Sequence, residues 1–216
     1  MVKKTQITLA GAAGGIEAVL EEGEAKGPFH SSAYVAVICH PHPLYGGTMD
    51  NKVVSTLTRV YRELGITSLR FNFRGVGASE GEHDAARGEV DDLCLVSEWL
   101  LAQYPESQLL LAGFSFGSAI VAAASERTPV AQMVLVAPPV ERYSYAPHGV
   151  FTCPVSVVCG GKDETVAEAG VRALLGSLKE PVELIFMSEA CHFYHGQLNT
   201  LREKLSATLR AFLTKV

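Results

Sequence analysis

Residues 109–123, with the sequence LLLAGFSFGSAIVAA, constrain the fold of this chain more than any other stretch. The apolar run that ends at Ala112 predicts a buried strand, and the small residues after Gly117 predict a helix. A strand that passes directly into a helix must turn within one or two residues, which forces Ser115 into a strained conformation and raises its hydroxyl above the sheet. Gly113 and Gly117 leave room for this turn, since a Cβ at either position would strike a neighbouring element. The pattern predicts a serine nucleophile at the start of a helix, and the alternative is an ordinary Gly/Ser turn.

The rest of the chain alternates between strand and helix patterns. We expect a hairpin from residues 6–10 and 16–21, strands at 34–39, 67–73, 132–137, 154–159 and 182–187, and helices at 51–64, 89–102, 165–178 and 197–213. A hairpin followed by this alternation indicates an α/β fold with a doubly wound, mostly parallel sheet and helices on both faces. The length suits a single domain over residues 1–216.

Composition limits the partners of the chain. The net charge of −5 gives no attraction to nucleic acid or to anionic membranes, so we expect neither partner. The five cysteines are an odd number and lie singly in apolar runs, as expected of buried thiols in a reducing compartment. The N-terminus lacks the apolar core of a signal peptide, and no apolar run has the length of a membrane span. These features predict a cytoplasmic protein, and no pattern calls for a cofactor; the oligomeric state is left open.

Three residues of the types that nucleophilic catalysis requires follow apolar runs in the second half of the chain. Ser115, Asp163 and His192 each come just after a predicted strand, and ligands bind at the carboxyl ends of the strands in an open parallel sheet. A serine hydroxyl needs a general base to become a nucleophile, and the base needs a carboxylate that fixes its tautomer. We therefore expect the three side chains to meet. Asp163 could instead cap a helix, while Glu189 and His195 are the rival carboxylate and the rival base.

A second motif, HPHPLYGG at residues 40–47, follows the first central strand. With the Gly-x-Ser-x-Gly turn and the Ser, Asp, His order, it makes nearly the whole chain resemble the α/β-hydrolase superfamily, and in particular its small cap-less bacterial serine hydrolases. The resemblance implies an eight-stranded sheet whose second strand is antiparallel, with no cap domain. It also implies that Ser115 is the nucleophile, His192 the general acid and base, and Asp163 the orienting carboxylate.

An oxyanion hole needs two backbone N–H donors. The N–H of Phe116, just after the nucleophile, is the first. The prolines of the 40–47 loop have no N–H, which leaves His42 and Leu44 for the second, and the resemblance favours His42, two residues after His40. His40 and His42 could also suggest a metal site, but alternate residues of an extended segment point in opposite directions, so we expect no metal.

Three further features have expected roles other than catalysis. Residues 75–81 lack the immediate helix of a dinucleotide-binding loop and are expected to form a turn that lines the site. Arg74 is expected to form a local salt bridge. Asp91 and Asp92 are expected to open a helix, where carboxylates offset the helix dipole.

Residues 138–152, where relatives of this kind insert a cap, form only a short loop, which predicts an open pocket. Its expected walls are aromatic: Tyr45, Phe116, Tyr143, Tyr145 and Phe151. The leading hypothesis is hydrolysis of small-acyl carboxylic esters or thioesters through an acyl-Ser115 intermediate. The alternatives are a peptidase or acyltransferase that uses the same residues, and a non-catalytic binding protein that retains the fold.

Overall fold

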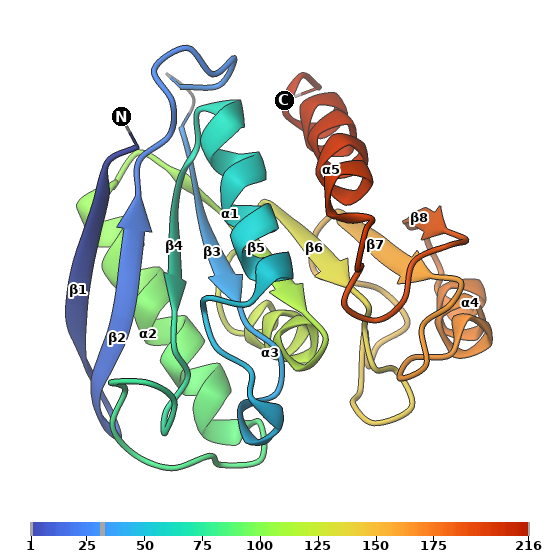
Figure 1. Cartoon of the computed structure of the whole chain (residues 1–216), viewed down its shortest axis with the longest axis horizontal. Coiled ribbons are helices and arrows are strands. Elements are labelled where there is room, and N and C mark those ends of the chain that lie inside the picture. Colours follow the sequence, from blue (N-terminus) through green and yellow to red (C-terminus); the bar gives the residue numbers. More distant parts are fainter. Residues whose placement is uncertain (1, 31–32, 216) are drawn as a thin grey trace.

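A computed structural model describes residues 2–30 and 33–215 and shows a mixed sheet of eight strands in the order β1-β2-β4-β3-β5-β6-β7-β8 (Figure 1). The strands are β1 (Lys4–Gly11), β2 (Gly14–Glu21), β3 (Tyr34–Cys39), β4 (Thr67–Phe71), β5 (Gln108–Phe114), β6 (Gln132–Val136), β7 (Val155–Gly160) and β8 (Glu183–Met187). β2 is antiparallel to both β1 and β4, and the other neighbouring pairs are parallel. The predicted sheet with an antiparallel second strand is confirmed.

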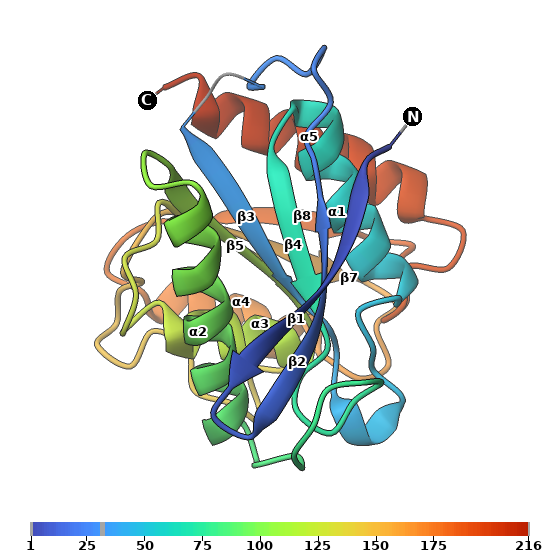
Figure 2. The same cartoon turned by 90° about the vertical axis from the view of Figure 1, so that its left-hand side faces the viewer.

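Helices cover both faces of this sheet (Figure 2). They are α1 (Lys52–Leu64), α2 (Arg87–Gln103), α3 (Phe116–Ala124), α4 (Glu168–Ser177) and α5 (Leu198–Leu213), with a 3₁₀ helix η1 (Pro43–Tyr45). α1 and α5 share one core layer, and α2, α3 and α4 share the other. In β3, Val37 packs in the second layer and its neighbour Ile38 in the first, which explains why this strand is apolar without interruption. In the part of the chain that the structure describes, no helix is long and apolar enough to cross a bilayer.

Local signals fix the ends of α1. The Asn51 side chain accepts a hydrogen bond from the N–H of Val53 at 2.8 Å, and Gly65 ends the helix with φ of +88°. α2 begins at Arg87, so Asp91 and Asp92 lie beyond its first turn and the expectation that they open the helix is wrong. They form ion pairs instead, Asp91 with Arg127 and Asp92 with Arg74, each at 2.7 Å. The predicted salt bridge of Arg74 is confirmed.

The 75–81 loop packs on the N-terminal hairpin, not on the candidate site. The N–H of Ala78 donates to the Glu17 carboxylate at 2.9 Å, and the N–H of Glu80 donates to the carbonyl of Gly15 at 2.8 Å. Gly75 and Gly81 border a separate surface hollow. The expectation that this turn lines the site is therefore wrong, because hydrogen bonds to β2 hold it at the hairpin.

The first turn of α3 lies directly against the end of β3. A Cβ on Gly117 would lie 2.5 Å from the carbonyl oxygen of Cys39 and 2.6 Å from that of His40, and a Cβ on Gly113 would overlap the carbonyl of Gly117. Both glycines of the Gly-x-Ser-x-Gly turn are thus required by close backbone approach. This contact brings the 40–47 loop beside Ser115.

Replacing Gly117 by alanine should lower the free energy of unfolding by about 1–3 kcal/mol, because the new methyl group forces backbone atoms apart. Gly176, in the last turn of α4, is the matched control: its Cβ would meet nothing within 4 Å. Gly176→Ala should leave stability unchanged or raise it by up to about 1 kcal/mol. Urea unfolding of the two variants checks this, and equal effects would contradict the steric explanation.

Candidate active site

Ser115 occupies a one-residue turn between β5 and α3. Its φ of +52° lies in the left-handed region that side chains rarely adopt. Its N–H donates to the carbonyl of Val136 at 2.8 Å, and its own carbonyl accepts the N–H of Ser118 at 2.9 Å. These bonds hold the strained turn, and the hydroxyl points toward the loop after β8.

The imidazole of His192 lies between Ser115 and Asp163. Its Nε2 is 3.1 Å from Oγ of Ser115, and its Nδ1 is 2.9 Å from Oδ2 and 3.1 Å from Oδ1 of Asp163. The ring is 4% exposed and packs against Phe114 and Phe193, with ring centroids 5.1 and 5.2 Å away. The structure brings together these three residues from the loops after β5, β7 and β8. With Nδ1–H donated to the carboxylate, Nε2 is free to accept a proton from the serine hydroxyl.

Asp163 also organises its own loop. Its Oδ1 accepts the N–H groups of Thr165 and Val166, each at 2.8 Å. α4 begins only at Glu168, so Asp163 does not cap that helix, and the predicted start of the helix at residue 165 is three residues too early. These bonds fix the carboxylate plane that faces His192.

The rival residues lie elsewhere. The carboxylate of Glu189 pairs with Lys162 and is 64% exposed. The ring of His195 stacks on Phe193 at 5.9 Å, and its Nδ1 lies 3.8 Å from Sγ of Cys191. The structure therefore places Asp163 and His192, and neither rival, beside Ser115.

The 40–47 loop holds both expected candidates for the second oxyanion donor. The N–H of Leu44 donates to Nδ1 of His42 at 3.2 Å, and the Leu44 side chain is 69% exposed. In the described part of the chain, the backbone N–H of His42 has no acceptor. As the first residue of α3, Phe116 has an N–H without an intrahelical acceptor. The N–H of Leu44 is thus engaged and that of His42 is not, and the oxyanion role of His42 and Phe116 stays a prediction.

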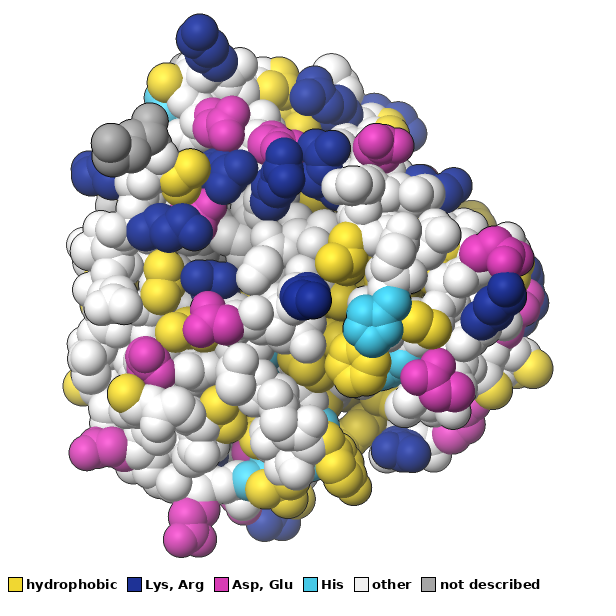
Figure 3. All heavy atoms as spheres, in the orientation of Figure 1, with side chains coloured by type: hydrophobic (Ala, Val, Ile, Leu, Met, Phe, Trp, Pro, Cys, Tyr) yellow, Lys and Arg dark blue, Asp and Glu magenta, His cyan; other side chains and the backbone are white. Residues whose placement is uncertain are grey.

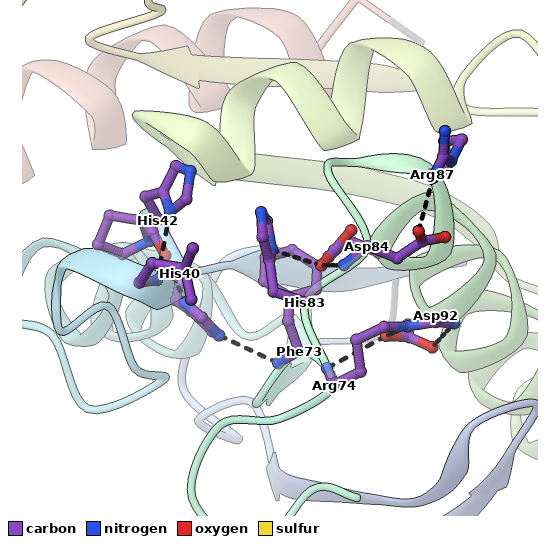
Figure 4. Close-up of polar contacts among 11 residues, drawn as sticks. His40, His42, Phe73, Arg74, His83, Asp84, Arg87 and Asp92 are labelled. Atoms are coloured by element: carbon purple, nitrogen blue, oxygen red, sulfur yellow. Dashed lines mark hydrogen bonds and ion pairs between the residues drawn. The ribbon is translucent and has the colours of Figure 1, made fainter. Parts of the chain in front are cut away.

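His40 ties this loop to the sheet (Figure 4). It is fully buried, its Nδ1 lies 2.6 Å from the carbonyl of Pro41, and its Nε2 accepts the N–H of Phe73 at 3.0 Å. Burial lowers the pKa of His40 to about 4. Both ring nitrogens are engaged, so neither is free to bind a metal ion. No group of three or more His, Cys, Asp or Glu suited to a metal occurs among residues 2–30 and 33–215.

A further histidine lies behind the loop. Figure 4 shows His83 and His42 on neighbouring segments. The ring of His83 packs against those of His42 and Phe116, with centroids 4.9 and 5.7 Å away, and its Nδ1 is 2.7 Å from the buried carboxylate of Glu89. Burial is the main cause of a lowered pKa at His42. His83 and Glu89 could not be predicted from the sequence, because nothing in the local pattern brings residues near 40 and near 85 together.

A cavity of about 420 Å³ opens above Ser115. Its lining comprises Pro41, His42, Tyr45, Gly46, Gly47, Asn51, Ser115, Phe116, Pro139, Arg142, Tyr143, Thr165, His192 and Phe193. The predicted wall residues Tyr45, Phe116 and Tyr143 are among them. The view in Figure 3 shows histidine and hydrophobic side chains gathered together on one face of the molecule.

The prediction that Tyr145 and Phe151 line this cavity is wrong. Tyr145 is buried, and its hydroxyl hydrogen-bonds Oγ of Ser118 at 2.8 Å, so the ring points beneath α3. Phe151 borders another hollow, near the start of β7. Arg142 and Phe193 also line the cavity and are absent from the predicted set, although they adjoin the predicted residues Tyr143 and His192.

Acid should reveal the buried, neutral state of His40. Its folded pKa of about 4 lies below the ordinary value of 6.5, so as the pH falls from 6.5 to 4 only the unfolded chain gains this proton. The stability present above pH 6.5 should decrease over this range by about 3 kcal/mol through this group. His40→Gln should lose that part of the pH dependence, although it should be less stable at neutral pH. Urea unfolding at several pH values measures both slopes, and equal slopes would contradict a neutral buried His40.

Comparison with known proteins identifies the family to which this fold belongs. The α/β-hydrolase fold family matches residues 45–151. A serine hydrolase without a lid from Xanthomonas campestris is 36% identical with a TM-score of 0.92, over 97% of this chain and 95% of the other. A serine hydrolase homologue from Coxiella burnetii is 40% identical with a TM-score of 0.90, over 95% and 97%. An uncharacterised protein from Rickettsia prowazekii is 34% identical over 80% of this chain and 79% of its own length.

A more distant structure extends the comparison at the level of the fold. An esterase from Pyrococcus furiosus is 18% identical with a TM-score of 0.80, over 99% of this chain and 93% of that one. At this identity only the fold is shared. The chain belongs to the α/β-hydrolase superfamily, and its similar solved structures include a serine hydrolase that has no lid.

Proposed function

We propose that this protein hydrolyses carboxylic esters or thioesters with small acyl groups, through a covalent acyl-Ser115 intermediate. The observation that carries the proposal is the continuous contact from Asp163 through His192 to the hydroxyl of Ser115. The similarity to the serine hydrolase from X. campestris is consistent with it.

Acylation begins when Nε2 of His192 takes the proton of Ser115 as Oγ attacks the carbonyl carbon of the ester. The negative charge moves to the carbonyl oxygen, where the N–H groups of Phe116 and His42 stabilise it. The tetrahedral intermediate then collapses, the bond to the leaving oxygen or sulfur breaks, and His192 returns the proton to the leaving group. Asp163 stabilises the imidazolium that exists between these two transfers.

Deacylation repeats the sequence with water. His192 takes a proton from a water molecule, whose oxygen attacks the acyl carbon, and the same N–H groups bind the oxyanion. Collapse releases the carboxylic acid and restores the Ser115 hydroxyl with the proton held by His192. Each cycle therefore consumes one ester and one water and requires no external acid or base.

The shape of the cavity supports a small substrate. A volume of about 420 Å³ suits a small organic molecule, and the short 138–152 loop leaves the entrance open. Aromatic rings line its walls, which favours an apolar acyl or alcohol part next to the reacting carbonyl.

Ser115→Ala should reduce kcat for 4-nitrophenyl acetate by about a thousandfold or more, since the variant has no nucleophile. A fluorophosphonate should add to the wild-type protein at Ser115 and leave the variant unlabelled, as mass spectrometry of tryptic peptides can show. Wild-type protein that hydrolyses no ester and carries no adduct on Ser115 would refute the proposal.

Asp163→Asn should lower kcat by about a thousandfold to ten-thousandfold, because the amide favours the wrong tautomer of His192. Glu189→Gln is the matched control, a change at an exposed carboxylate that pairs with Lys162, and it should keep activity within about twofold of wild type. Steady-state kinetics on one ester give both values. Similar losses of kcat in the two variants would contradict the orienting role of Asp163.

A further inference from the structure

Arg142 lines the same cavity as Ser115 and His192, on the short 138–152 loop, and its side chain is exposed. After burial and the charge of His83, its positive charge contributes to the lowered pKa of His42. Burial raises the pKa of Tyr143, and the charge of Arg142 opposes that rise. Arg142 therefore shares the lining of one cavity with His42 and Tyr143.

This guanidinium has no counter-ion in the described part of the chain. Every arginine except Arg142 and Arg210 forms an ion pair with a carboxylate there. Such pairing is expected for a chain with a net charge of −5, so an unpaired arginine beside the reactive serine is unusual.

Three carboxylates near the lining residues already have partners. Asp163 contacts His192, Glu89 contacts His83, and Glu164 accepts the backbone N–H of His192 at 3.4 Å. The described lining itself contains neither Asp nor Glu. The cavity thus combines apolar aromatic walls with one free cation.

A neutral ester would leave this cation without a partner. A carboxylate or phosphate group can accept two parallel hydrogen bonds from a guanidinium, which is the geometry that arginine recognises best. Next to apolar walls such a pair is screened less than on an open surface.

We propose that Arg142 binds an anionic group of the substrate, so that the preferred substrate is an ester or thioester whose acyl or alcohol part carries a carboxylate or a phosphate. This inference rests on the proposed ester hydrolysis at Ser115. Arg142 sets selectivity and takes no part in the bond-breaking steps.

Three matched substrate pairs test the inference. Mono-4-nitrophenyl adipate against 4-nitrophenyl hexanoate places the anion on the acyl part. 4-Acetoxybenzoate against its methyl ester places a carboxylate on the leaving group, and 4-acetoxyphenyl phosphate against 4-acetoxyanisole places a phosphate there. The measured quantity is the ratio of kcat/KM for the anionic and the neutral member of each pair.

For at least one pair, Arg142→Gln should lower this ratio by about tenfold, mainly through KM, while kcat/KM for the neutral ester changes little. Arg142→Lys should keep part of the preference, since it keeps the charge and loses the planar pair of donors. Arg210→Gln is the control, because Arg210 is exposed, also unpaired, and on α5 away from the cavity lining. It should leave every ratio unchanged.

The inference is overturned if the protein hydrolyses the neutral esters but the anionic-to-neutral ratio of kcat/KM is the same in wild type and Arg142→Gln for all three pairs. The proposed function would still stand in that case. A protein that hydrolyses none of the esters and takes no fluorophosphonate on Ser115 would instead remove the proposed function, and this inference with it.

Discussion

The one-residue turn at Ser115 is the constraint on which the rest of the site depends. β5 ends at Phe114 and α3 begins at Phe116, so the chain has no spare residue with which to relax the turn. A side chain held at φ of +52° costs about 1–3 kcal/mol, and it persists only where the surroundings determine it. Here β6 supplies the Val136 carbonyl, and the Gly117 backbone lies against the end of β3. Since β5 lies between β3 and β6, the sheet itself fixes the position of the hydroxyl.

The loop after β7 uses a single carboxylate for two purposes. Oδ1 of Asp163 receives two backbone N–H groups of its own loop, and both oxygens face the imidazole of His192. The bonds that shape the loop are therefore the bonds that aim the carboxylate. A shift of this loop would move the Asp163 carboxylate and so change the orientation of the His192 ring. The loop conformation and the position of the imidazole are therefore coupled.

Much of this arrangement could be predicted from the sequence, because the relevant signals are local. The uninterrupted apolar run of β3 reflects its coverage on both faces, and Asn51 and Gly65 carry the conformations that begin and end α1. The Gly-x-Ser-x-Gly pattern fixes a turn whose two glycines are each required by a backbone contact. The order Ser115, Asp163, His192 then follows from the topology of the sheet, which brings the ends of β5, β7 and β8 to one edge.

The failed predictions concern irregular segments, where the direction of a side chain depends on distant partners. Tyr143 and Tyr145 are two residues apart, yet one faces the cavity and the other hydrogen-bonds Ser118 beneath α3. The 75–81 loop is held by Glu17, about sixty residues earlier in the chain. No local pattern encodes such contacts, and for the same reason the absence of a counter-ion at Arg142 could not be predicted.

The neutral and the charged groups of the site lie on different loops. His40 lies at the base of the 40–47 loop and is held neutral by burial and by the N–H of Phe73, which requires an acceptor. Stabilisation of an oxyanion at this loop would then come from backbone N–H dipoles, whose strength does not vary with protonation. The permanent charge in the cavity belongs to Arg142, on a different and exposed loop. In the proposed reaction, a change at Arg142 would therefore alter which ester is bound without disturbing the turn, the imidazole or the N–H groups proposed to act on the reacting carbonyl.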